Sequence, residues 1–390
     1  MNIVFFSNPD FMGSENAPEF SSMHRFTMIL ANGMAQRGHE VTLWKPERKY
    51  FSIPAPAAVK KWLGYVDQYI VFPATVKKRL KHCPPDTLFV FTDQAQGPWL
   101  PLVATRKHVM HCHDFLAQLS AMGKIEQHKT SWTGKQYQYF IRRGYEKGKN
   151  FISVSRKTDQ VLKELLPHQP ASTAVVYNGL DPSYRPFFHG KARRLITKKT
   201  GIDFTGGYCL HVGGNQWYKN REGVIEIYTA WRKQTEWTLP LLMIGPSPSR
   251  AVQQLVERSP FKQDIHFISN LSDEFVRYAY AGANAFLFPS HAEGFGWPIA
   301  EAMASGCPVL TTDLAPMTEV AGGAAFLITP RGPENDDTWA TRAAITLHQI
   351  ICLTTANRKA VIAAAISNVK RFDTTATVDQ IEFIYGHITS

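Results

Sequence analysis

The sequence predicts an α/β protein with two domains, each built around a parallel β-sheet. The chain has 390 residues, more than twice the usual length of one domain. Strand-sized runs rich in β-branched and aromatic residues alternate with longer helical patterns, as in βαβ units. Between the two halves, residues 181–194 combine prolines, a glycine and basic residues without apolar periodicity, which is typical of a hinge.

Each half contains about six candidate strands. In the first half they are residues 3–7, 40–44, 87–92, 108–112, 151–154 and 174–177. In the second half they are residues 208–212, 241–244, 265–267, 285–288, 309–311 and 325–328. Two sets of this kind predict two similar α/β domains, because helices between strands return the chain to the same end of a parallel sheet.

The composition excludes several classes of protein. The chain is 44% hydrophobic, 12% aromatic and 19% charged, and it has no run approaching the ~20 apolar residues of a membrane-spanning helix. A disordered chain, a coiled coil and an integral membrane protein are therefore not expected. The chain opens on a strand-like run without the features of a secretory signal, so we expect a cytoplasmic protein. Five widely spaced cysteines without a CxxC pair predict buried or idle thiols.

The charge is unevenly divided. Residues 1–180 carry a net charge of +10, whereas residues 181–390 carry +1. A basic half suits an anionic partner such as a membrane surface, a phosphorylated lipid or an acidic glycan, although a merely solvated surface has the same composition. No nucleic-acid recognition motif accompanies the charge, so a nucleic-acid partner is not expected.

One basic stretch of the first half is amphipathic. Apolar residues recur at helical spacing between residues 59 and 70, with lysines and an arginine flanking them at Lys60, Lys61, Lys77, Lys78, Arg79 and Lys81. A helix at a membrane surface has this pattern, and so has a helix packed on its own sheet. The residues alone leave both interpretations open.

The most specific stretch is residues 285–330. A buried strand ends at Pro289, a polar and glycine-rich loop follows, and Pro298 suits the first turn of a helix. Such a loop lies where open parallel sheets bind ligands. Gly294 and Gly296 allow a ligand close to the backbone, and the amides of Ile299 and Ala300 at the helix start are suited to a diphosphate.

Two carboxylates bracket this loop. Glu293 lies before it and Glu301 falls in the first turns of the helix. Together they can each grip a different diol of one extended ligand, one on a sugar ring and one on a ribose. The alternative is structural: a carboxylate near a helix start is favoured by the helix dipole, and a loop glutamate is solvated.

This segment resembles a known family. EGFGWPIAEAMASGCPV is similar to the E-x7-E signature of retaining glycosyltransferases of family four. Weaker similarities follow the same order along the chain: VVYNGLDPSYRP, HVGGNQWYKN, MIGPSP and RFDTTATVDQIEFIY. The resemblance implies the GT-B fold, in which two Rossmann-like parallel-sheet domains face each other across a cleft. It places an acceptor-side domain at residues 1–185, with helix 373–390 crossing back to it, and a nucleotide-sugar-binding domain at residues 195–372.

The resemblance also implies roles for individual residues. Glu293 would contact the donor sugar, Glu301 would hold the ribose, and Lys219 would neutralise the diphosphate leaving group. The remaining donor-binding positions would be Gly213, Gly214, Gly245, Gly294, Phe295, Gly296 and Ile299. His113 would face sugar or acceptor hydroxyls as a second catalytic residue, although alternation along the strand lets either His111 or His113 project. Ser22, Arg25 and Asp114 would lie on the acceptor side.

The sequence departs from the family at two places. An arginine that relatives carry near the lysine is replaced by Gly214 and Tyr218, and Arg221 is the nearest substitute. Serines 21 and 22 stand where relatives have a glycine pair. Trp297 replaces a smaller aliphatic residue, which is the one local indication of an altered sugar pocket.

The chemistry expected at this site is glycosyl transfer without a metal. Breaking a glycosyl–phosphate bond develops negative charge on the leaving oxygen and positive charge on the sugar, so a lysine on one side and a carboxylate on the other lower the barrier. No D-x-D triplet is present for a divalent metal, and no cofactor is expected besides a nucleotide-sugar co-substrate, most simply a UDP- or GDP-sugar. Retention by front-face attack is implied by the family alone.

The predicted function is transfer of a sugar from a nucleotide-sugar to a glycan or a polyprenyl-diphosphate-linked acceptor in cell-surface polysaccharide or glycoconjugate synthesis. Contact with an anionic membrane at its cytoplasmic face would suit such an acceptor. Two alternatives share the architecture: a nucleotide-sugar epimerase, which needs no acceptor site, and a catalytically silent module that binds a partner.

Overall fold

The structure is a computed structural model that describes residues 1–11, 22–332 and 338–390. The chain divides into two compact units. The first comprises Met1–Ile125, Lys129–Tyr177 and Thr375–Ser390, and the second comprises Glu126–His128 and Asn178–Thr374. The division therefore falls at Tyr177, a few residues before the hinge that the sequence indicates.

The first unit contains a six-stranded sheet with the order β2-β1-β3-β4-β5-β6. Its strands are β1 (Asn2–Phe6), β2 (Glu40–Trp44), β3 (Leu88–Phe91), β4 (His108–Cys112), β5 (Asn150–Ser153) and β6 (Ser172–Val175). Its helices are α1 (Ser22–Gln36), α2 (Ala57–Val66), α3 (Phe72–Leu80), α4 (Leu116–Ala121), α5 (Trp132–Tyr145), α6 (Arg156–Leu165) and nearly all of α15 (Thr374–Thr389). Short turns of 3₁₀- or π-helix are η2 (Tyr50–Ser52), η3 (Asp67–Val71) and η4 (Gln94–Leu102).

The second unit contains another six-stranded sheet, with the order β12-β11-β10-β7-β8-β9. Its strands are β7 (Cys209–Val212), β8 (Leu241–Ile244), β9 (Ile265–Ile268), β10 (Ala285–Phe288), β11 (Val309–Thr312) and β12 (Phe326–Ile328). Its helices are α7 (His189–Thr200), α8 (Arg221–Lys233), α9 (Arg250–Arg258), α10 (Asp273–Gly282), α11 (Trp297–Ala304), α12 (Met317–Ala321), α13 (Trp339–Ile351) and α14 (Thr355–Val369). Short 3₁₀ turns are η5 (Trp217–Lys219), η6 (Lys262–Asp264) and η7 (Lys370–Phe372).

All named strand pairs in both sheets are parallel, and all twelve strands expected from the sequence are present. The first strand of each unit is central: β1 pairs with β2 and β3, and β7 pairs with β8 and β10. The second sheet has the 3-2-1-4-5-6 strand order of the Rossmann fold, and the first begins with the 2-1-3-4-5 order of the other common doubly wound fold. In both kinds of sheet, ligands bind beyond the carboxyl ends of the strands where the strand order reverses. The predicted GT-B fold, with two Rossmann-like domains, is confirmed.

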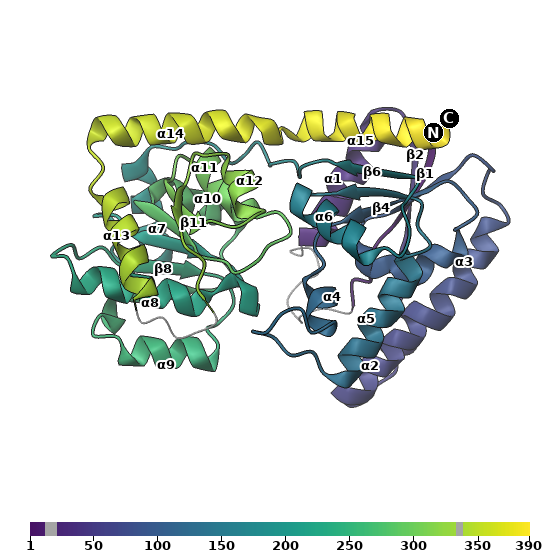
Figure 1. Ribbon diagram of the computed structural model, residues 1–390, viewed down its shortest axis with the longest axis horizontal. Coiled ribbons are helices and arrows are strands. Elements are labelled where there is room, and N and C mark those ends of the chain that lie inside the picture. Colours follow the sequence, from purple (N-terminus) through teal and green to yellow (C-terminus); the bar gives the residue numbers. More distant parts are fainter. Residues whose placement is uncertain (12–21, 333–337) are drawn as a thin grey trace. The chain divides into compact units, whose positions relative to one another are not determined.

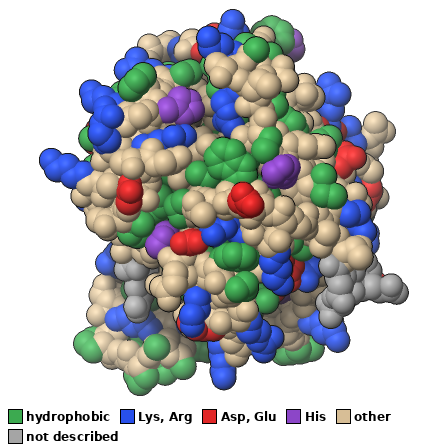
Figure 2. All heavy atoms as spheres, turned by 90° about the vertical axis from the view of Figure 1, so that its left-hand side faces the viewer, with side chains coloured by type: hydrophobic (Ala, Val, Ile, Leu, Met, Phe, Trp, Pro, Cys, Tyr) green, Lys and Arg blue, Asp and Glu red, His purple; other side chains and the backbone are tan. Residues whose placement is uncertain are grey.

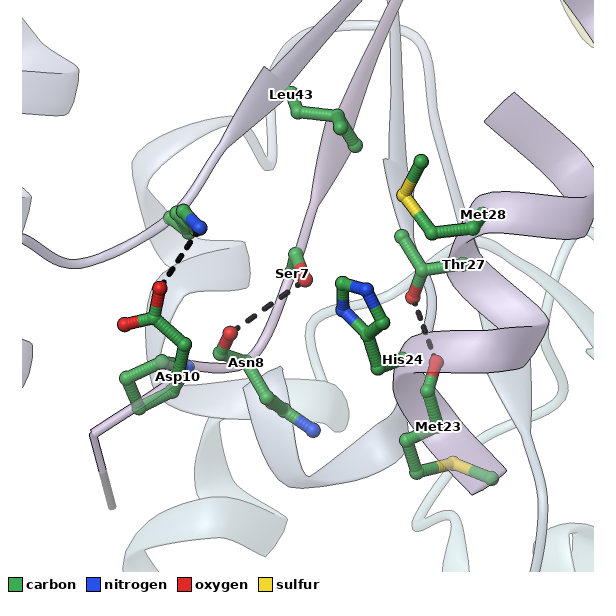
Figure 3. Close-up of a pocket in the computed structure, with 10 residues that line it drawn as sticks. Ser7, Asn8, Asp10, Met23, His24, Thr27, Met28 and Leu43 are labelled. Atoms are coloured by element: carbon green, nitrogen blue, oxygen red, sulfur yellow. Dashed lines mark hydrogen bonds and ion pairs between the residues drawn. The ribbon is translucent and has the colours of Figure 1, made fainter. Parts of the chain in front are cut away.

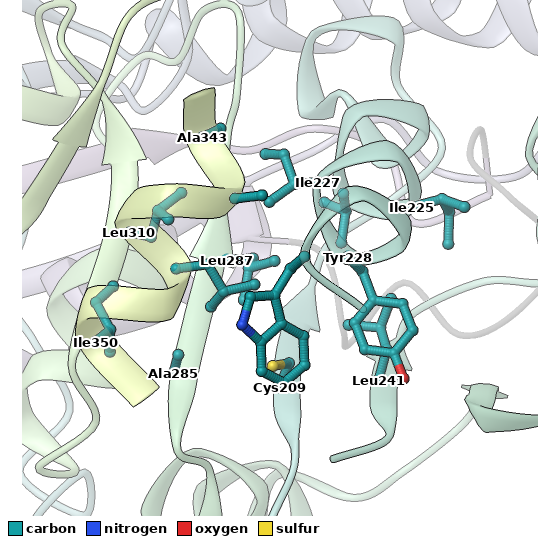
Figure 4. Packing of buried hydrophobic residues seen from close by; sticks show 14 of the residues in the cluster. Cys209, Ile225, Ile227, Tyr228, Leu241, Ala285, Leu287, Leu310, Ala343 and Ile350 are labelled. Carbon is teal, nitrogen blue, oxygen red and sulfur yellow. The ribbon is translucent and has the colours of Figure 1, made fainter. Parts of the chain in front are cut away.

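Helices cover both faces of the sheet in the second unit. Figure 1 shows α8 and α13 on one face of the sheet and α10 and α11 on the other. Ile227, Tyr228 and Trp231 of α8 are fully buried against β7, β8 and α13, as Figure 4 shows for the labelled residues. Cys209 of β7 lies in this core, where burial raises the pKa of its thiol to about 12.

The segment predicted as a hinge is only partly irregular. Residues 181–188 have no regular structure, but α7 begins at His189, inside the predicted stretch. Ala192 and Ile196 are four residues apart on α7 and both are fully buried. Ile196 lies beyond residues 181–194, so the helical spacing of the two buried residues could not be recognised in that stretch alone.

The surface of the second unit matches its nearly neutral charge. Figure 2 shows Lys and Arg side chains interspersed with acidic and hydrophobic ones over the face that it presents, without one large basic patch. Among the described residues, no single helix is long and apolar enough to cross a membrane. Among the same residues, one pair of consecutive helices, Trp339–Ile351 and Thr355–Phe372, has the length and composition of a membrane span when the two are taken together. A bend of 104° separates them.

Candidate functional site

An ion pair joins two of the predicted site residues in the second unit. β10 ends at Phe288, and the loop after it carries Glu293 at the carboxyl end of the sheet. Lys219 Nζ lies 2.9 Å from both carboxylate oxygens of Glu293. Only 16% of the Lys219 side chain and 7% of the Glu293 side chain are exposed. The two charges that the sequence assigns to opposite ends of a breaking glycosyl–phosphate bond therefore lie in one site.

Backbone contacts hold the two loops of this ion pair together. Lys219 ends η5, and Asn220 follows it in the left-handed conformation with φ of 50°. The Asn220 side chain donates to the Pro289 carbonyl at 2.9 Å and accepts from the Gly223 amide at the start of α8. The His291 amide donates to the Tyr218 carbonyl at 2.8 Å. These bonds connect the loops on both sides of Lys219 and Glu293, so the distance between the two charges is set by backbone positions.

Glu301 is held by a partner that the sequence did not reveal. It lies on α11 with 8% of its surface exposed. The Tyr280 hydroxyl of α10 donates to Glu301 Oε2 at 3.1 Å. Burial and the adjacent carboxylate raise the pKa of Tyr280 well above its usual value, so the phenol keeps its proton and remains a donor. Tyr280 is thus a positioning residue for the carboxylate expected to bind a ribose.

The loop that enters α11 is buttressed by aromatic residues. Gly296 has φ of 105°, which only glycine adopts readily, and it turns the chain into the helix. Phe295 is buried and packs edge-to-face on Phe372 at 5.3 Å between ring centroids. The Trp297 indole donates to the Gly179 carbonyl at 3.1 Å. The rings of Phe295 and Trp297 are therefore committed to packing, and Phe295 offers a ligand its backbone.

One expectation about this helix start differs from the structure. The Ile299 amide was expected to point outward toward a diphosphate. In the structure it donates to the Gly296 carbonyl at 3.0 Å, and the Ile299 side chain is fully buried. The cause is the tight turn at Gly296, which brings its carbonyl within reach of the amide three residues later.

The glycines after β7 and β8 lie in direct backbone contact. Gly245 has φ of 149°, and a Cβ atom on it would lie 2.1 Å from the Gly213 carbonyl oxygen. The Gly213 amide donates to the Ile244 carbonyl at 3.0 Å. A Cβ on Gly214 would lie 2.2 Å from Gln216 Oε1. The packing of these loops against each other thus requires glycine at position 245 independently of any ligand, whereas a Cβ on Gly213 would lie 2.8 Å from Nε2 of His211 in β7.

A cavity beside this ion pair contains residues that the sequence did not indicate. Its volume is about 260 Å³, and Trp217, His291 and Arg331 are among the residues that line it. The His291 ring stacks on Trp217 at 6.2 Å, and burial together with Arg331 lowers the pKa of His291. These residues lie in loops without periodicity, so no sequence pattern could bring them together.

Arg221, the nearest substitute for the arginine that relatives carry, is bound to partners within the second unit. Its guanidinium is buried and donates to the carbonyl of Pro246 at 2.9 Å and to the Asn215 side chain. It also lies over the Phe267 ring at 5.5 Å. Asn215 lies in the loop after β7, Pro246 lies in the loop after β8, and Phe267 belongs to β9. Arg221 therefore ties together the loops after β7 and β8, and it lines the same cavity as His291 of the Glu293 loop.

The described residues contain no group of three or more histidine, cysteine, aspartate or glutamate side chains that could hold a metal ion.

In the first unit, His113 follows β4 and is almost completely buried. Its Nε2 donates to the Thr92 carbonyl at 2.9 Å, and its backbone amide donates to Gln94 Oε1 at 2.9 Å. The ring packs edge-on against Phe26 at 4.5 Å. Burial lowers the pKa of His113, opposed by the charge of Asp93, so the ring is neutral at pH 7. A neutral imidazole with one nitrogen bound to a carbonyl has its other nitrogen as an acceptor.

His111, the alternative on the same strand face, points into the protein. Its Nε2 lies 2.7 Å from the Tyr385 hydroxyl of α15, and burial lowers its pKa to about 3. Its role in the structure is to anchor the C-terminal helix on the first sheet.

The remaining acceptor-side predictions lie around the start of two helices. Asp114 Oδ1 accepts from the Leu116 amide at 3.0 Å and so caps the entry to α4. Arg25 is half-buried on α1. Ser22 is the first residue of α1, and its side chain lies outside the described residues, as does Ser21.

A small pocket of about 70 Å³ lies at the carboxyl ends of β1 and β2. Figure 3 shows Ser7 and Asn8 at the end of β1, facing His24 and Thr27 of α1 across it. Lys45 Nζ pairs with Asp10 at 3.0 Å on its rim. This is the corresponding strand end of the first sheet, where the acceptor-side residues were expected, and His24 of α1 lines it.

Two family models match the chain. Residues 23–184 match the model described as Glycosyltransferase Family 4, and residues 207–347 match the model described as Glycosyl transferases group 1. The first range lies mostly within the first unit and the second range within the second unit.

Curated relatives include an O-antigen mannosyltransferase and a lipopolysaccharide glucosyltransferase. The chain is 32% identical to O-antigen chain mannosyltransferase B of Escherichia coli over 145 residues, which are 34% of this chain and 38% of that protein. It is 24% identical to the lipopolysaccharide glucosyltransferase WaaG of Escherichia coli strain K12 over 309 residues, which are 75% of this chain and 77% of that protein. The match to the first of these relatives thus spans less than half of its length.

Solved structures share the fold over the full chain. Sucrose-phosphate synthase from Thermosynechococcus elongatus superposes with a TM-score of 0.75 at 16% identity, covering 99% of this chain and 98% of that one. HepE of Anabaena, solved in complex with UDP and glucose, superposes with a TM-score of 0.70 at 18% identity, covering 99% of this chain and 100% of that one.

Proposed function

The chain belongs to the glycosyltransferases of family four and has the GT-B fold, and on this premise we propose that it transfers a sugar from a nucleotide-sugar with retention of configuration and without a metal. The observation that carries the proposal is the Lys219–Glu293 ion pair at the glycine-rich entry to α11. It combines the cation and the carboxylate that a breaking glycosyl–phosphate bond requires.

The donor we propose is a UDP- or GDP-sugar. Lys219 has three donor hydrogens, so it can bind a diphosphate oxygen while it remains near Glu293. The N-terminus of α11 adds a favourable partial charge for the same group. Glu301, oriented by Tyr280, would accept from the ribose hydroxyls. The complex of HepE with UDP and glucose supports a nucleotide donor in a protein of this fold.

In the proposed reaction the bond between the anomeric carbon and the phosphate oxygen breaks and leaves its electron pair on the nucleoside diphosphate. Lys219 and the helix start stabilise this negative charge, and Glu293 stabilises the positive charge on the sugar. The acceptor hydroxyl attacks the same face and passes its proton to the departing phosphate. His113, neutral and fixed by Thr92, would orient hydroxyl groups from the first unit.

The acceptor we propose is a glycan or a polyprenyl-diphosphate-linked glycan of a cell-surface polysaccharide, met at the cytoplasmic face of a membrane. The similarity to an O-antigen mannosyltransferase and to a lipopolysaccharide glucosyltransferase supports this class. The net charge of +10 in the first 180 residues suits both an anionic membrane and a diphosphate-linked substrate.

Thermal-shift measurements test the donor site. The chain is screened with UDP, GDP, ADP, dTDP and their common sugar conjugates, and the screen is repeated with Lys219→Ala and Glu301→Ala. A ligand at 100 times its Kd stabilises a protein by roughly 2.7 kcal/mol, which is a readable shift. We expect one nucleotide class to stabilise the wild type and both variants to lose the effect.

Lys233→Ala and Glu236→Ala are the matched controls, because both residues are exposed at the end of α8 and beyond it. They should keep the full shift. If no nucleotide stabilises the wild type, or if the site variants respond like the controls, the donor site is not where we place it and the silent binding module becomes the better description.

A further inference from the structure

The first unit carries a helical segment whose outer side is apolar and basic. α2, η3 and α3 follow each other directly, so residues 57–80 form one helical run with a π-helical turn at its centre. Trp62 and Ile70 on this run are each 66% exposed. Lys77, Lys78 and Lys81 are exposed as well. Residues 70, 77 and 81 recur at helical spacing and therefore lie on one side of the run.

The inner side of the run packs on α5 through a seam of tyrosines. The Tyr65 ring stacks on Tyr137 at 5.7 Å, and the hydroxyls of Tyr69 and Tyr137 lie 2.7 Å apart. Phe140 of α5 meets Tyr69 edge-on at 5.4 Å, and Trp62 meets Tyr65 at 5.7 Å. Figure 1 shows α2 and α5 side by side, in agreement with these contacts. The rings form a continuous series from Trp62 on one helix to Phe140 on the other.

α5 contributes exposed aromatic residues of its own. Trp132 is 73% exposed, and Tyr139 and Phe140 are about half exposed. Lys135 and Arg143 are exposed on the same helix. Together with the outer side of the run they form what we call the aromatic-basic face: Trp62, Ile70, Lys77, Lys78, Trp132, Lys135, Tyr139, Phe140 and Arg143.

The charge of this face is one-sided. Residues 57–85 and 129–145 contain ten lysines and arginines and a single acidic residue, Asp67. Asp67 is fully buried, and its carboxylate accepts from the backbone amides of Lys49, Tyr50 and Phe51. Two of the arginines pair with acidic residues from outside these segments, Arg79 with Glu47 and Arg142 with Glu146. The lysines and Arg143 carry the remaining positive charge of the two segments.

We propose that the aromatic-basic face docks on the surface of an anionic lipid bilayer. Tryptophan and tyrosine rings are favoured at the level of lipid headgroups, and basic side chains beside them are attracted by anionic lipids at about 1 kcal/mol each, or roughly fivefold in affinity. The proposal extends the membrane contact of the proposed function by assigning its surface. Its test measures lipid binding alone, so it can fail while the transferase activity stands.

Vesicle flotation at low salt tests the proposal with the full chain. Vesicles containing phosphatidylglycerol should carry the protein, whereas pure phosphatidylcholine vesicles should not, and high salt should weaken the binding. Lys77→Ser/Lys78→Ser should lower the apparent affinity about tenfold or more, which is the loss of two basic contacts. Trp62→Ser/Phe140→Ser should lower it as well, because the rings no longer enter the headgroup layer.

Matched controls come from the second unit. Lys198→Ser/Lys199→Ser removes an equivalent pair from the last turn of α7, and Trp237→Ser removes an exposed tryptophan. Both should bind vesicles like the wild type. Three results would overturn the proposal: no binding of the wild type to phosphatidylglycerol at low salt, equal losses in the two lysine pairs, or full binding by the Trp62→Ser/Phe140→Ser variant. Unchanged unfolding temperatures of all variants would establish that they are folded.

Discussion

At the scale of single residues, the sequence predicts the charged residues of the donor site more directly than it predicts the side chains that contact them. Glu293 and Glu301 are predicted because a glycine-rich loop between a strand and a helix leaves few roles for such residues, and Lys219 is predicted from the resemblance to the family. The Lys219–Glu293 contact spans 74 positions, and Tyr280 reaches Glu301 from another helix. Side-chain partners of this kind depend on how the elements pack, which local spacing does not encode.

The Tyr280 hydroxyl offers a test of that packing. Tyr280→Phe removes the donor to Glu301 and keeps the ring, so we expect nucleotide affinity to fall about tenfold or more, the worth of one hydrogen bond to a charged group. Calorimetric titration with the stabilising nucleotide measures the change.

Tyr208→Phe is the matched control, since its buried hydroxyl donates at 2.7 Å to the Ala279 carbonyl rather than to a site residue. Both variants should lose some stability, but only Tyr280→Phe should lose nucleotide affinity. Equal affinities in the two variants would show that the Tyr280 hydroxyl does not orient a ligand-binding carboxylate.

At the scale of elements, strands are predicted better than helices. All twelve strands lie within two residues of the expected bounds, because apolar runs between turn residues are unmistakable in a buried parallel sheet. The amphipathic run at 59–70 packs on the protein with one side: Leu63, Val66 and Tyr69 turn inward, whereas Trp62 and Ile70 remain exposed. The spacing of the run could predict that it has two different sides. It could not predict that the inward side packs on α5.

The helical run 57–80 also fixes the loop that precedes it, through a buried aspartate. The buried Asp67 carboxylate accepts from three successive amides at 2.8–3.1 Å. Asp67→Ala leaves these donors without their acceptor, and we expect the free energy of unfolding to fall by about 2–4 kcal/mol. Denaturant titration measures the loss, with the exposed Asp86→Ala as control. A loss below about 0.5 kcal/mol, or an equal loss in the control, would contradict this role of Asp67.

At the scale of the whole molecule, the order of the segments carried the family prediction, and the two family models and the parallel sheets confirm it. The cavity lined by Trp217 and His291 joins residues that no periodicity relates, so its lining could not be predicted from the sequence. The fold was therefore predictable from sequence, whereas this part of the site was not.

The two sheets share a pH-sensitive feature. His111 in the first and His211 in the second are fully buried, and burial lowers the pKa of each to about 3. In the unfolded chain a histidine titrates near 6.5, so the unfolded state binds more protons between pH 3 and 6.5. Stability should be fully present above about pH 6.5 and should fall steadily as the pH is lowered toward 3.

Unfolding temperatures measured from pH 7 to pH 4 test this expectation. The wild type should lose stability throughout the range, and His211→Gln should flatten the profile because one buried group no longer titrates. A profile with the same slope in both proteins would mean that protonation of His211 does not oppose folding.

The measurement that bears most directly on the central claim is release of nucleoside diphosphate from the donor that stabilises the protein, compared between the wild type and Glu293→Gln. Glutamine keeps the shape of the side chain but removes the charge expected to stabilise the sugar cation. We predict that Glu293→Gln binds the donor with similar affinity and releases nucleoside diphosphate at least about 100-fold more slowly, the usual loss for one electrostatic contact in a transition state. Equal rates in the two proteins would contradict a role for Glu293 in glycosyl transfer.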